Sequence, residues 1–228
     1  PILAPTSVAD TFEVTVEAFN LAEDYQTPVI ILSDQEIAQR KELVDPIDTT
    51  RFKVLERKRP SEADLQDYRR FRMTEDCISP VSHPGMPGGN YLGAGIEHNE
   101  HGDPTASGLM HAKMNEKRFR KFDRLHQRRD LLRIDGDPKA PLALVSWGSS
   151  AGVCREALKL ARAEGLQAKL LVPILIYPVN EEVYRALVEV PADGPPDAVD
   201  ADRVRGSILR FLHRAGYDVW SWEDRALL

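Results

Sequence analysis

Two short stretches of the sequence hold the groups best suited to chemistry. The first, "SWGSSAG" at residues 146–152, lies between an apolar run and an amphipathic run, so it predicts a turn from a strand into a helix. Its glycines permit close approach to the free amides of a helix N-terminus, which favour anions. Its serines can cap the helix or bind a ligand, and its tryptophan offers a flat apolar wall. Two interpretations stay open, a capped turn or contact with a phosphate or carboxylate. The candidate binding residues are Trp147, Gly148, Ser149, Ser150 and Gly152.

The second stretch, "EHNEHG" at residues 97–102, brings two imidazoles and two carboxylates together. Such groups can ligate zinc or serve as acid and base. No H-E-x-x-H helix accompanies them, and the spacing supplies no third neutral ligand, so the sequence predicts no metal site here. His98 and His101 are candidates for a loop that faces a cofactor or another subunit. The alternative is a pair of hydrogen-bonded surface histidines.

Composition limits the class of protein. The 228 residues carry a formal charge of −6, which argues against a general nucleic-acid binder. Neither an apolar run long enough for a membrane span nor a signal-peptide pattern occurs, and we expect a cytoplasmic protein with no nucleic-acid or membrane partner. Cys77 and Cys154 stand far apart without a C-x-x-C motif, which is typical of structural thiols.

The first part of the chain predicts a βαβ unit. "ILAP" and "TPVIIL" (27–32) have the composition of buried strands, and the run between them has helical periodicity with Phe12, Val16 and Phe19 on one face. Ser7 and Asp10 have the spacing of a capping box. Strand, helix and strand at this length require parallel pairing. We expect both strands to have an unpaired edge unless another segment covers them.

A long irregular stretch, residues 35–108, separates this unit from a basic helix at 109–133. The stretch is dense in proline and glycine but has aromatic residues to bury, so we expect it to wrap over other surfaces. The helix holds nine Lys/Arg against three acidic residues. Two interpretations stay open for its charge, a solvated face or a docking surface for an acidic partner. We expect the chain to form an oligomer in which an acidic surface of a partner contacts residues 113–133.

A second α/β pattern follows the turn "RIDGDPKAP". It predicts the strand "PLALVSW", a helix at 151–164, and the strand "QAKLLVPIL". The helix is expected to face inward through Val153, Ala157, Leu160 and Ala161. Beyond it the sequence predicts a short helix at 180–187, a helix at 203–215 and a closing strand "YDVWSW".

Several motifs occur together in one order: "EAFNLAEDYQTPVIILSD", "ISPVSHPGMPGG", "GIEHNEHGDP", "HAKMNEKRFRKFD" and "LVSWGSSAG". In this order they resemble the C-terminal portion of the alpha subunit of 2-oxoacid:ferredoxin oxidoreductases, most of all the 2-oxoglutarate type. The resemblance covers residues 1 to about 190 and fades after "LVEV". The family's upstream Arg-Gly-Gly-Pro-Ser-Thr-Gly-type loop does not occur in these residues.

The resemblance implies a fold and a function. It implies an α/β fold, with an incomplete parallel sheet of a thiamine-enzyme pyrimidine domain followed by a small transketolase-C-like α/β domain. The implied division is the end of the pyrimidine domain at 1–44, a wrapping segment with the basic helix at 45–138, and the transketolase-C-like domain at 139–228. The implied reaction is oxidative decarboxylation of a 2-oxoacid to an acyl-CoA, with electrons passed to ferredoxin.

The same resemblance implies the cofactors and partners. Thiamine diphosphate and Mg²⁺ would lie mainly on a thiamine-binding beta subunit, because no G-D-G…N motif occurs here, and iron–sulfur clusters would lie on other subunits or domains. Coenzyme A would be a substrate, and no cofactor would be bound by this chain alone. The alternative function is a non-catalytic transketolase-C-like module that binds an anion or a partner and regulates.

Overall fold

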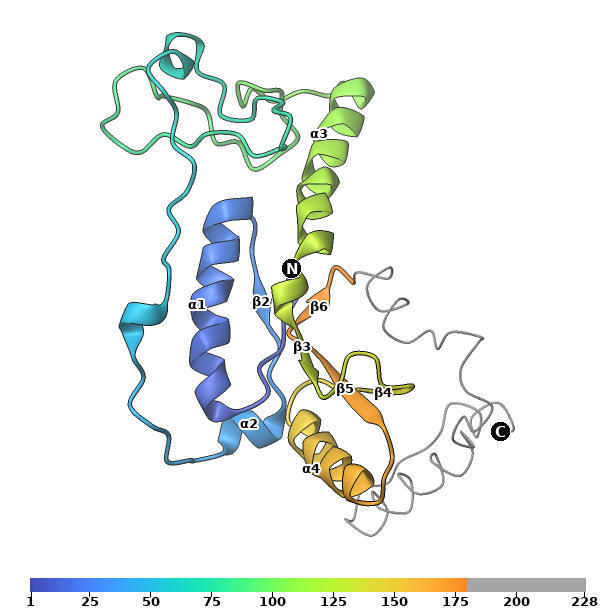
Figure 1. The fold of residues 1–228 in the computed structure, drawn as a ribbon. Coiled ribbons are helices and arrows are strands. Elements are labelled where there is room, and N and C mark those ends of the chain that lie inside the picture. Colours follow the sequence, from blue (N-terminus) through green and yellow to red (C-terminus); the bar gives the residue numbers. More distant parts are fainter. Residues whose placement is uncertain (180–228) are drawn as a thin grey trace.

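The computed structural model describes residues 1–179, which form two small sheets with helices packed beside them (Figure 1). The first sheet has the strand order β2–β1–β6 and the second β3–β5–β4. The strands are β1 (Ile2–Leu3), β2 (Ile30–Ile31), β3 (Leu132–Asp135), β4 (Leu142–Val145), β5 (Ala168–Pro173) and β6 (Leu175–Tyr177). The α/β class predicted from the sequence is confirmed.

Strand β1 is the centre of the first sheet. It pairs in parallel with β2, in the register Ile2 to Ile30, so the predicted βαβ unit is present. On its other side β1 pairs antiparallel with β6, which follows directly on β5 of the second sheet. The expected edge of β1 is therefore covered by another segment, the exception that the prediction allowed. Strand β2 has no second partner strand among the described residues, and its Ile30 is 56% exposed.

Helix α1 (Val8–Tyr25) begins at the predicted cap. The Ser7 hydroxyl accepts a hydrogen bond from the amide of Asp10 at 3.1 Å. The Asp10 carboxylate accepts the amide and the hydroxyl of Thr6, at 2.8 and 2.9 Å, which satisfies donors that would otherwise be buried and unpaired.

The buried face of α1 differs from the predicted one. The side chains that pack on the sheet are Val14, Ala18, Leu21 and Tyr25. The expected stripe of Phe12, Val16 and Phe19 lies on a neighbouring face, and Phe19 is 70% exposed. Both stripes have helical spacing, so periodicity alone does not choose between them.

Part of the irregular segment covers the outer side of α1, as we expected from its aromatic residues. The Asn20 side chain, which is buried, donates to the carbonyl of Lys53 and accepts the amide of Leu55, both at 2.8 Å. The Asn20 amide thus satisfies one backbone acceptor and one backbone donor of the segment, as the backbone of an adjacent β-strand would. Arg57 forms a two-pronged ion pair with Glu23, with both distances at 2.8 Å.

The basic helix is shorter than predicted. Helix α3 spans Gly108–Arg120 and continues as 3₁₀ turns at Lys121–Gln127 and Arg129–Leu131, after which β3 begins. The sequence placed Leu132 and Arg133 in the helix and started a turn at "RIDG". They form a strand instead, because their backbone pairs antiparallel with β5. The apolar side of α3 and its 3₁₀ continuation packs inward through Met114 and Leu125, which are both buried.

The second unit has the predicted parallel arrangement. Strands β4 and β5 pair in parallel, and α4 (Ser150–Ala163) connects them and ends before Gly165, whose φ is +84°. The inward face is only partly as expected. Ala157 is buried, but Leu160 is 44% exposed because Ala151 and Leu158 occupy the core positions.

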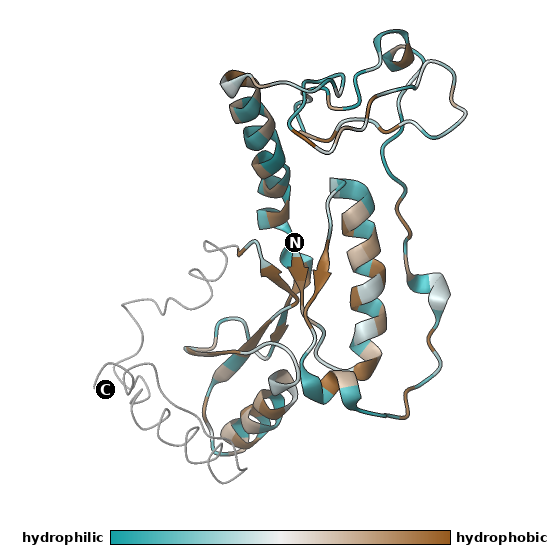
Figure 2. Ribbon diagram, turned by 180° about the vertical axis from the view of Figure 1, so that it is seen from behind, coloured by the Kyte–Doolittle hydropathy of each residue, from teal (hydrophilic) through white to brown (hydrophobic). Residues whose placement is uncertain are grey.

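The two sheets share one hydrophobic core. A single cluster joins Leu3 and Leu21 of the first unit to Leu158 and Leu170 of the second. Figure 2 shows the strands as mainly hydrophobic and α3 as mainly hydrophilic. The division into domains at 44 and 138 stays a prediction. The predicted helices at 180–187 and 203–215 and the strand at 217–222 lie outside the described residues. Within residues 1–179 no helix is long and apolar enough to cross a membrane.

We predict that Asn20→Ala destabilises the fold by about 1–3 kcal/mol, because it leaves the Lys53 carbonyl and the Leu55 amide without their partner. Urea unfolding measures the loss. The matched control is Asn90→Ala, at an exposed position, which should stay within about 0.5 kcal/mol of the original chain. Equal effects of both substitutions would contradict this role for Asn20.

Candidate functional site

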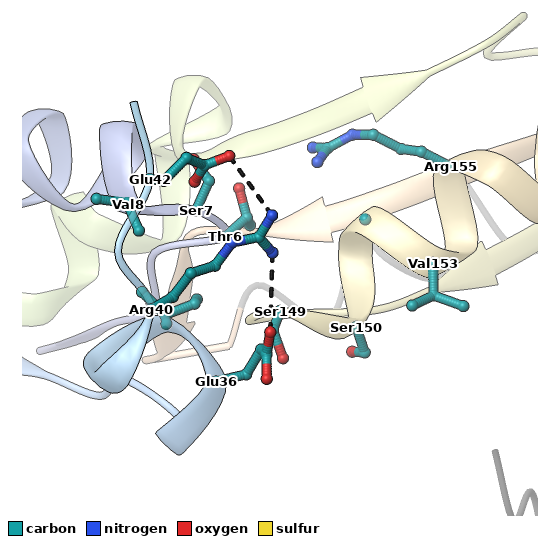
Figure 3. Close-up of a pocket in the computed structure, with 12 residues that line it drawn as sticks. Thr6, Ser7, Val8, Glu36, Arg40, Glu42, Ser149, Ser150, Val153 and Arg155 are labelled. Atoms are coloured by element: carbon teal, nitrogen blue, oxygen red, sulfur yellow. Dashed lines mark ion pairs between the residues drawn. The ribbon is translucent and has the colours of Figure 1, made fainter. Parts of the chain in front are cut away.

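A cavity of about 630 Å³ lies between the N-terminal ends of α1 and α4 and the short helix α2 (Gln35–Gln39), as Figure 3 shows. Three of the residues predicted from the sequence line it, namely Ser149, Ser150 and Gly152. The other lining residues are Thr6, Ser7, Val8, Glu36, Ile37, Arg40, Glu42, Val153 and Arg155.

The turn before α4 is occupied by a carboxylate of this same chain. The amide of Ser149 donates to Oδ2 of Asp34 at 2.7 Å. Asp34 also caps α2 by accepting the amide of Ile37 at 3.0 Å. Burial opposes the ionisation of Asp34, but the hydrogen bonds from Ser149 and Ile37 offset it and keep the pKa of Asp34 below its usual value. This geometry favours the capped-turn interpretation for the Ser149 amide.

The glycine of the turn has a definite reason. Gly148 adopts a φ of +64°, and a Cβ at this position would lie 2.7 Å from Oδ2 of Asp34. Any larger residue would therefore meet both backbone strain and the capping carboxylate. By contrast, a Cβ on Gly152 would have nothing within 4 Å, so Gly152 keeps the cavity open without being needed for the turn.

The remaining side chains of the turn bond locally. The Ser150 hydroxyl donates to the carbonyl of Trp147 and lies 2.7 Å from the Ser146 hydroxyl. Trp147 is 44% exposed and is not among the residues that line the cavity. The structure thus brings Ser149, Ser150 and Gly152 to the cavity and leaves Trp147 beside it.

Two guanidinium groups and two carboxylates line the cavity. Arg40 lies between Glu36 and Glu42, at 3.8 and 3.6 Å, and all three side chains are well exposed, so these ion pairs are weak. Arg155 projects from α4 and holds Asp135 at 2.7 Å. Together with the two helix N-termini, these cations suit a carboxylate or phosphate group. The lining residues supply no pair of nucleophile and base, so the arrangement is suited to binding.

The "EHNEHG" loop lies away from this cavity and is held by local contacts. His98 is buried, with its ring centroid 3.8 Å from that of Phe71 and its Nδ1 2.9 Å from the carbonyl of Asn99. His101 is exposed. The side-chain oxygen of Asn99 accepts three successive amides, from residues 101, 102 and 103. In the part of the chain that the structure describes, no group of three His, Cys, Asp or Glu residues could hold a metal ion.

Glu97 ties this loop to α3. Its carboxylate accepts hydrogen bonds from His111, at 2.6 Å, and from Arg118, at 3.0 Å. The Arg118 and His111 hydrogen bonds lower the pKa of Glu97 to about 2. The loop is therefore anchored by an anion that stays charged at neutral pH.

Much of the charge of the basic helix is balanced within the chain. Arg124 pairs with Asp24 and Arg128 with Glu17, both on α1, and Arg118 pairs with Glu97. The acidic surface that we expected from a partner is thus supplied in part by α1. Docking of a partner on residues 113–133 stays a prediction.

Sequence reasoning missed the charged residues of the site, among them Asp34, Arg40 and Arg155. Asp34 lies three residues after the end of β2 and three residues before Ile37, and the second spacing is that of a helix cap and was the signal available. Arg155 had no sequence signal, because a single arginine in an amphipathic helix is ordinarily a solvated residue.

We predict that Gly148→Ala destabilises the chain by about 1–3 kcal/mol, through its positive φ and its contact with Asp34. The double variant Gly148→Ala with Asp34→Ala should recover the steric part of this loss, and the two effects should therefore not add. Thermal unfolding measures both. The matched control is Gly152→Ala, which should be neutral or stabilising by up to about 1 kcal/mol. Equal losses at both glycines would contradict the assigned geometry.

Known proteins with similar sequences fall in one group. Over 82% of its length the chain is 34% identical to subunit alpha of 2-oxoacid:ferredoxin oxidoreductase 2 from Aeropyrum pernix, of which it covers 30%. It is 31% identical to the 2-oxoglutarate synthase subunit KorA of Methanothermobacter thermautotrophicus, of which it covers 49%. The chain thus spans about a third to a half of the length of these curated relatives.

A solved structure has the same fold. It is the 2-oxoglutarate:ferredoxin oxidoreductase from Magnetococcus marinus, with 2-oxoglutarate, coenzyme A and succinyl-CoA bound. It matches 82% of this chain, with a TM-score of 0.74 and 34% sequence identity. This chain covers 32% of the length of that chain. The family described as "Pyruvate flavodoxin/ferredoxin oxidoreductase, thiamine diP-bdg" matches residues 1–117, which is more than half of the 228 residues. The chain therefore belongs to the pyruvate flavodoxin/ferredoxin oxidoreductase family and matches the thiamine diphosphate-binding part of it.

Proposed function

We propose that this chain is part of a thiamine diphosphate-dependent 2-oxoacid:ferredoxin oxidoreductase of the 2-oxoglutarate type. The observation that supports this most is the likeness to the Magnetococcus marinus enzyme, which has 2-oxoglutarate and succinyl-CoA bound and shares 34% identity with this chain at a TM-score of 0.74. The reaction would convert 2-oxoglutarate, or a related 2-oxoacid, and coenzyme A to an acyl-CoA, with electrons passed to ferredoxin.

The described residues fit a supporting part in this reaction. Thiamine diphosphate, when bound, supplies the carbanion chemistry, while the protein supplies binding and orientation. The diphosphate and its metal ion would be held mainly by a thiamine-binding beta subunit, because no G-D-G…N motif occurs in this sequence. Iron–sulfur clusters and the ferredoxin contact would lie on other subunits or domains. The contribution of this chain would be scaffold and subunit contacts.

The domain division belongs to the same proposal. Residues 1–44 would form the end of the pyrimidine-binding domain, 45–138 the wrapping segment with the basic helix, and 139–228 the transketolase-C-like domain. The edge strand β2, with Ile30 and Leu32 more than 40% exposed, supports an incomplete first sheet that another part of the enzyme covers.

The cavity between α1 and α4 would receive an anionic group of a ligand. We infer that this group is a phosphate of coenzyme A, because Arg155 and the N-terminal ends of two helices meet there. Ser149, Ser150 and Gly152 would line this contact and Trp147 would flank it. His98 and His101 would belong to a separate loop that contacts another subunit.

We predict that the complex assembled with a thiamine-binding partner reduces methyl viologen when given 2-oxoglutarate, coenzyme A and thiamine diphosphate, at least tenfold faster than with pyruvate. The 228-residue chain alone should show no such reduction, because the thiamine and metal sites would lie elsewhere. An assembled complex that is inactive with every 2-oxoacid would contradict the oxidoreductase assignment and favour the regulatory module. A preference for pyruvate would contradict only the 2-oxoglutarate type.

We predict that Arg155→Ala in this complex raises the KM for coenzyme A about tenfold, the size expected for loss of one charge-assisted contact. The KM for 2-oxoglutarate and kcat should stay within about twofold. The control is Lys159→Ala, at an exposed position of α4 outside the cavity, which should leave all three constants unchanged. An unchanged KM for coenzyme A with Arg155→Ala would show that the cavity is not its site.

A further inference from the structure

A buried ammonium group lies outside the cavity, at the middle of α3. The side chain of Lys117 is 7% exposed. Its Nζ donates to the carbonyl of Phe71, at 2.7 Å, and to the hydroxyl of Ser79. Both acceptors are uncharged. Among residues 1–179 no carboxylate lies within 4.0 Å of this nitrogen, whereas five of the other basic residues of 113–133 are within that distance of one.

Both acceptors belong to one irregular segment, residues 69–82, which we name the strap. The Ser79 hydroxyl also donates to the carbonyl of Arg72 at 2.7 Å, so Lys117 holds two turns of the strap at once. The carbonyl of Ser79 accepts Nε2 of Gln26, at the end of α1, also at 2.7 Å. Lys117 therefore stands where the strap meets α3, and Gln26 where it meets α1.

The groups that face Lys117 do little to compensate its charge. From the following 3₁₀ turn Lys121 repels it, and from the strap Arg70 does the same. The thiol of Cys77, when ionised, and the carboxylate of Glu100 favour its charge more weakly. Burial is the main cause that lowers the pKa of Lys117 to about 8, with repulsion by Lys121 and Arg70 adding to it.

We propose that attachment of the strap to α3 is coupled to release of a proton from Lys117, which makes the strap a pH-sensitive element of the fold. The neutral amine keeps both hydrogen bonds and avoids the cost of an ammonium ion removed from water. When the strap detaches, Lys117 returns to water, where the ammonium form is favoured again.

The direction of the pH dependence follows from the two states. Detached, Lys117 has its ordinary pKa of 10.5, and attached it has a pKa of about 8. Between these values the detached state binds more protons, so attachment strengthens as the pH rises through this window and weakens as it falls. Below about pH 8 both states are protonated, and attachment no longer depends on this group.

Cys77 is a built-in reporter of the strap, since its thiol lies within it and is 4% exposed. In the full chain with Cys154→Ser, it is the one remaining cysteine of the sequence. Protection is the rate at which a disulfide reagent reacts with a free peptide of residues 69–82, divided by the rate at which it reacts with Cys77 in the chain at the same pH. We expect protection to rise on the order of tenfold between about pH 7.5 and 9.5, as the shift to about 8 implies.

Three variants separate Lys117 from other causes. Lys117→Met removes the titrating group and should make protection independent of pH in this window. Lys117→Arg keeps a positive charge throughout, so its protection of Cys77 should also be independent of pH. This variant tests the proposal if the methionine variant does not fold. Lys113→Met, at an exposed position on the same helix, should retain the full rise. A flat profile with Lys117 present, or a rise that persists in a folded Lys117 variant, would overturn the proposal.

Discussion

The carboxylate of Asp10 is the contact on which the arrangement of the two sheets depends. It is buried at the start of α1, where it accepts both donors of Thr6, and it also binds Arg133 of β3 at 2.6 Å. The same side chain therefore begins the helix of the first unit and holds a strand of the second. Backbone hydrogen bonds make the same connection. The amide of Ala4 donates to the carbonyl of Ile174, and the amide of Ile174 donates to the carbonyl of Leu131. A carboxylate bound in this way is costly to expose, because each of its donors would be left unpaired.

Charge is balanced along the same boundary. The acidic side chains of α1, among them Glu17 and Asp24, point toward the basic segment that follows α3 and pair with Arg128 and Arg124. The chain thus supplies both members of an electrostatic contact between segments that lie about a hundred residues apart in sequence. The exposed Arg124 pair contributes little stability, but both pairs favour one docking of α1 against the segment that follows α3 over others.

Local sequence signals identified the elements well and their partners poorly. The cap at Ser7 and the stop at Gly165 depend on contacts within a few residues, so the sequence was sufficient to predict them. Strand β2 was predicted from its β-branched composition, although it pairs with β1 some distance away in the sequence. Strand β3 was predicted to be the end of a helix and the start of a turn, since only its pairing with the distant β5 makes it a strand. In the same way, nothing local marks Lys117 as buried, because its burial comes from the fold of residues 71–79 upon it. The candidate turn was recognised from its glycines and serines, but the carboxylate that fills it was not.

That carboxylate changes the meaning of the turn. A strand-to-helix turn with small residues presents amides that attract an anion, and here Asp34 meets part of that demand from within the chain. Asp34 is also the cap of α2, so the position of α2 is fixed relative to α4 by one side chain. The wall of the cavity that α2 provides, with Arg40, is consequently held by the same turn that provides Ser149 and Ser150. A ligand bound in this cavity would contact both units at once. Any movement between the units would change the size of the cavity. The turn therefore acts first as a joint between two units, and the proposed binding of a ligand depends on the cavity that this joint creates.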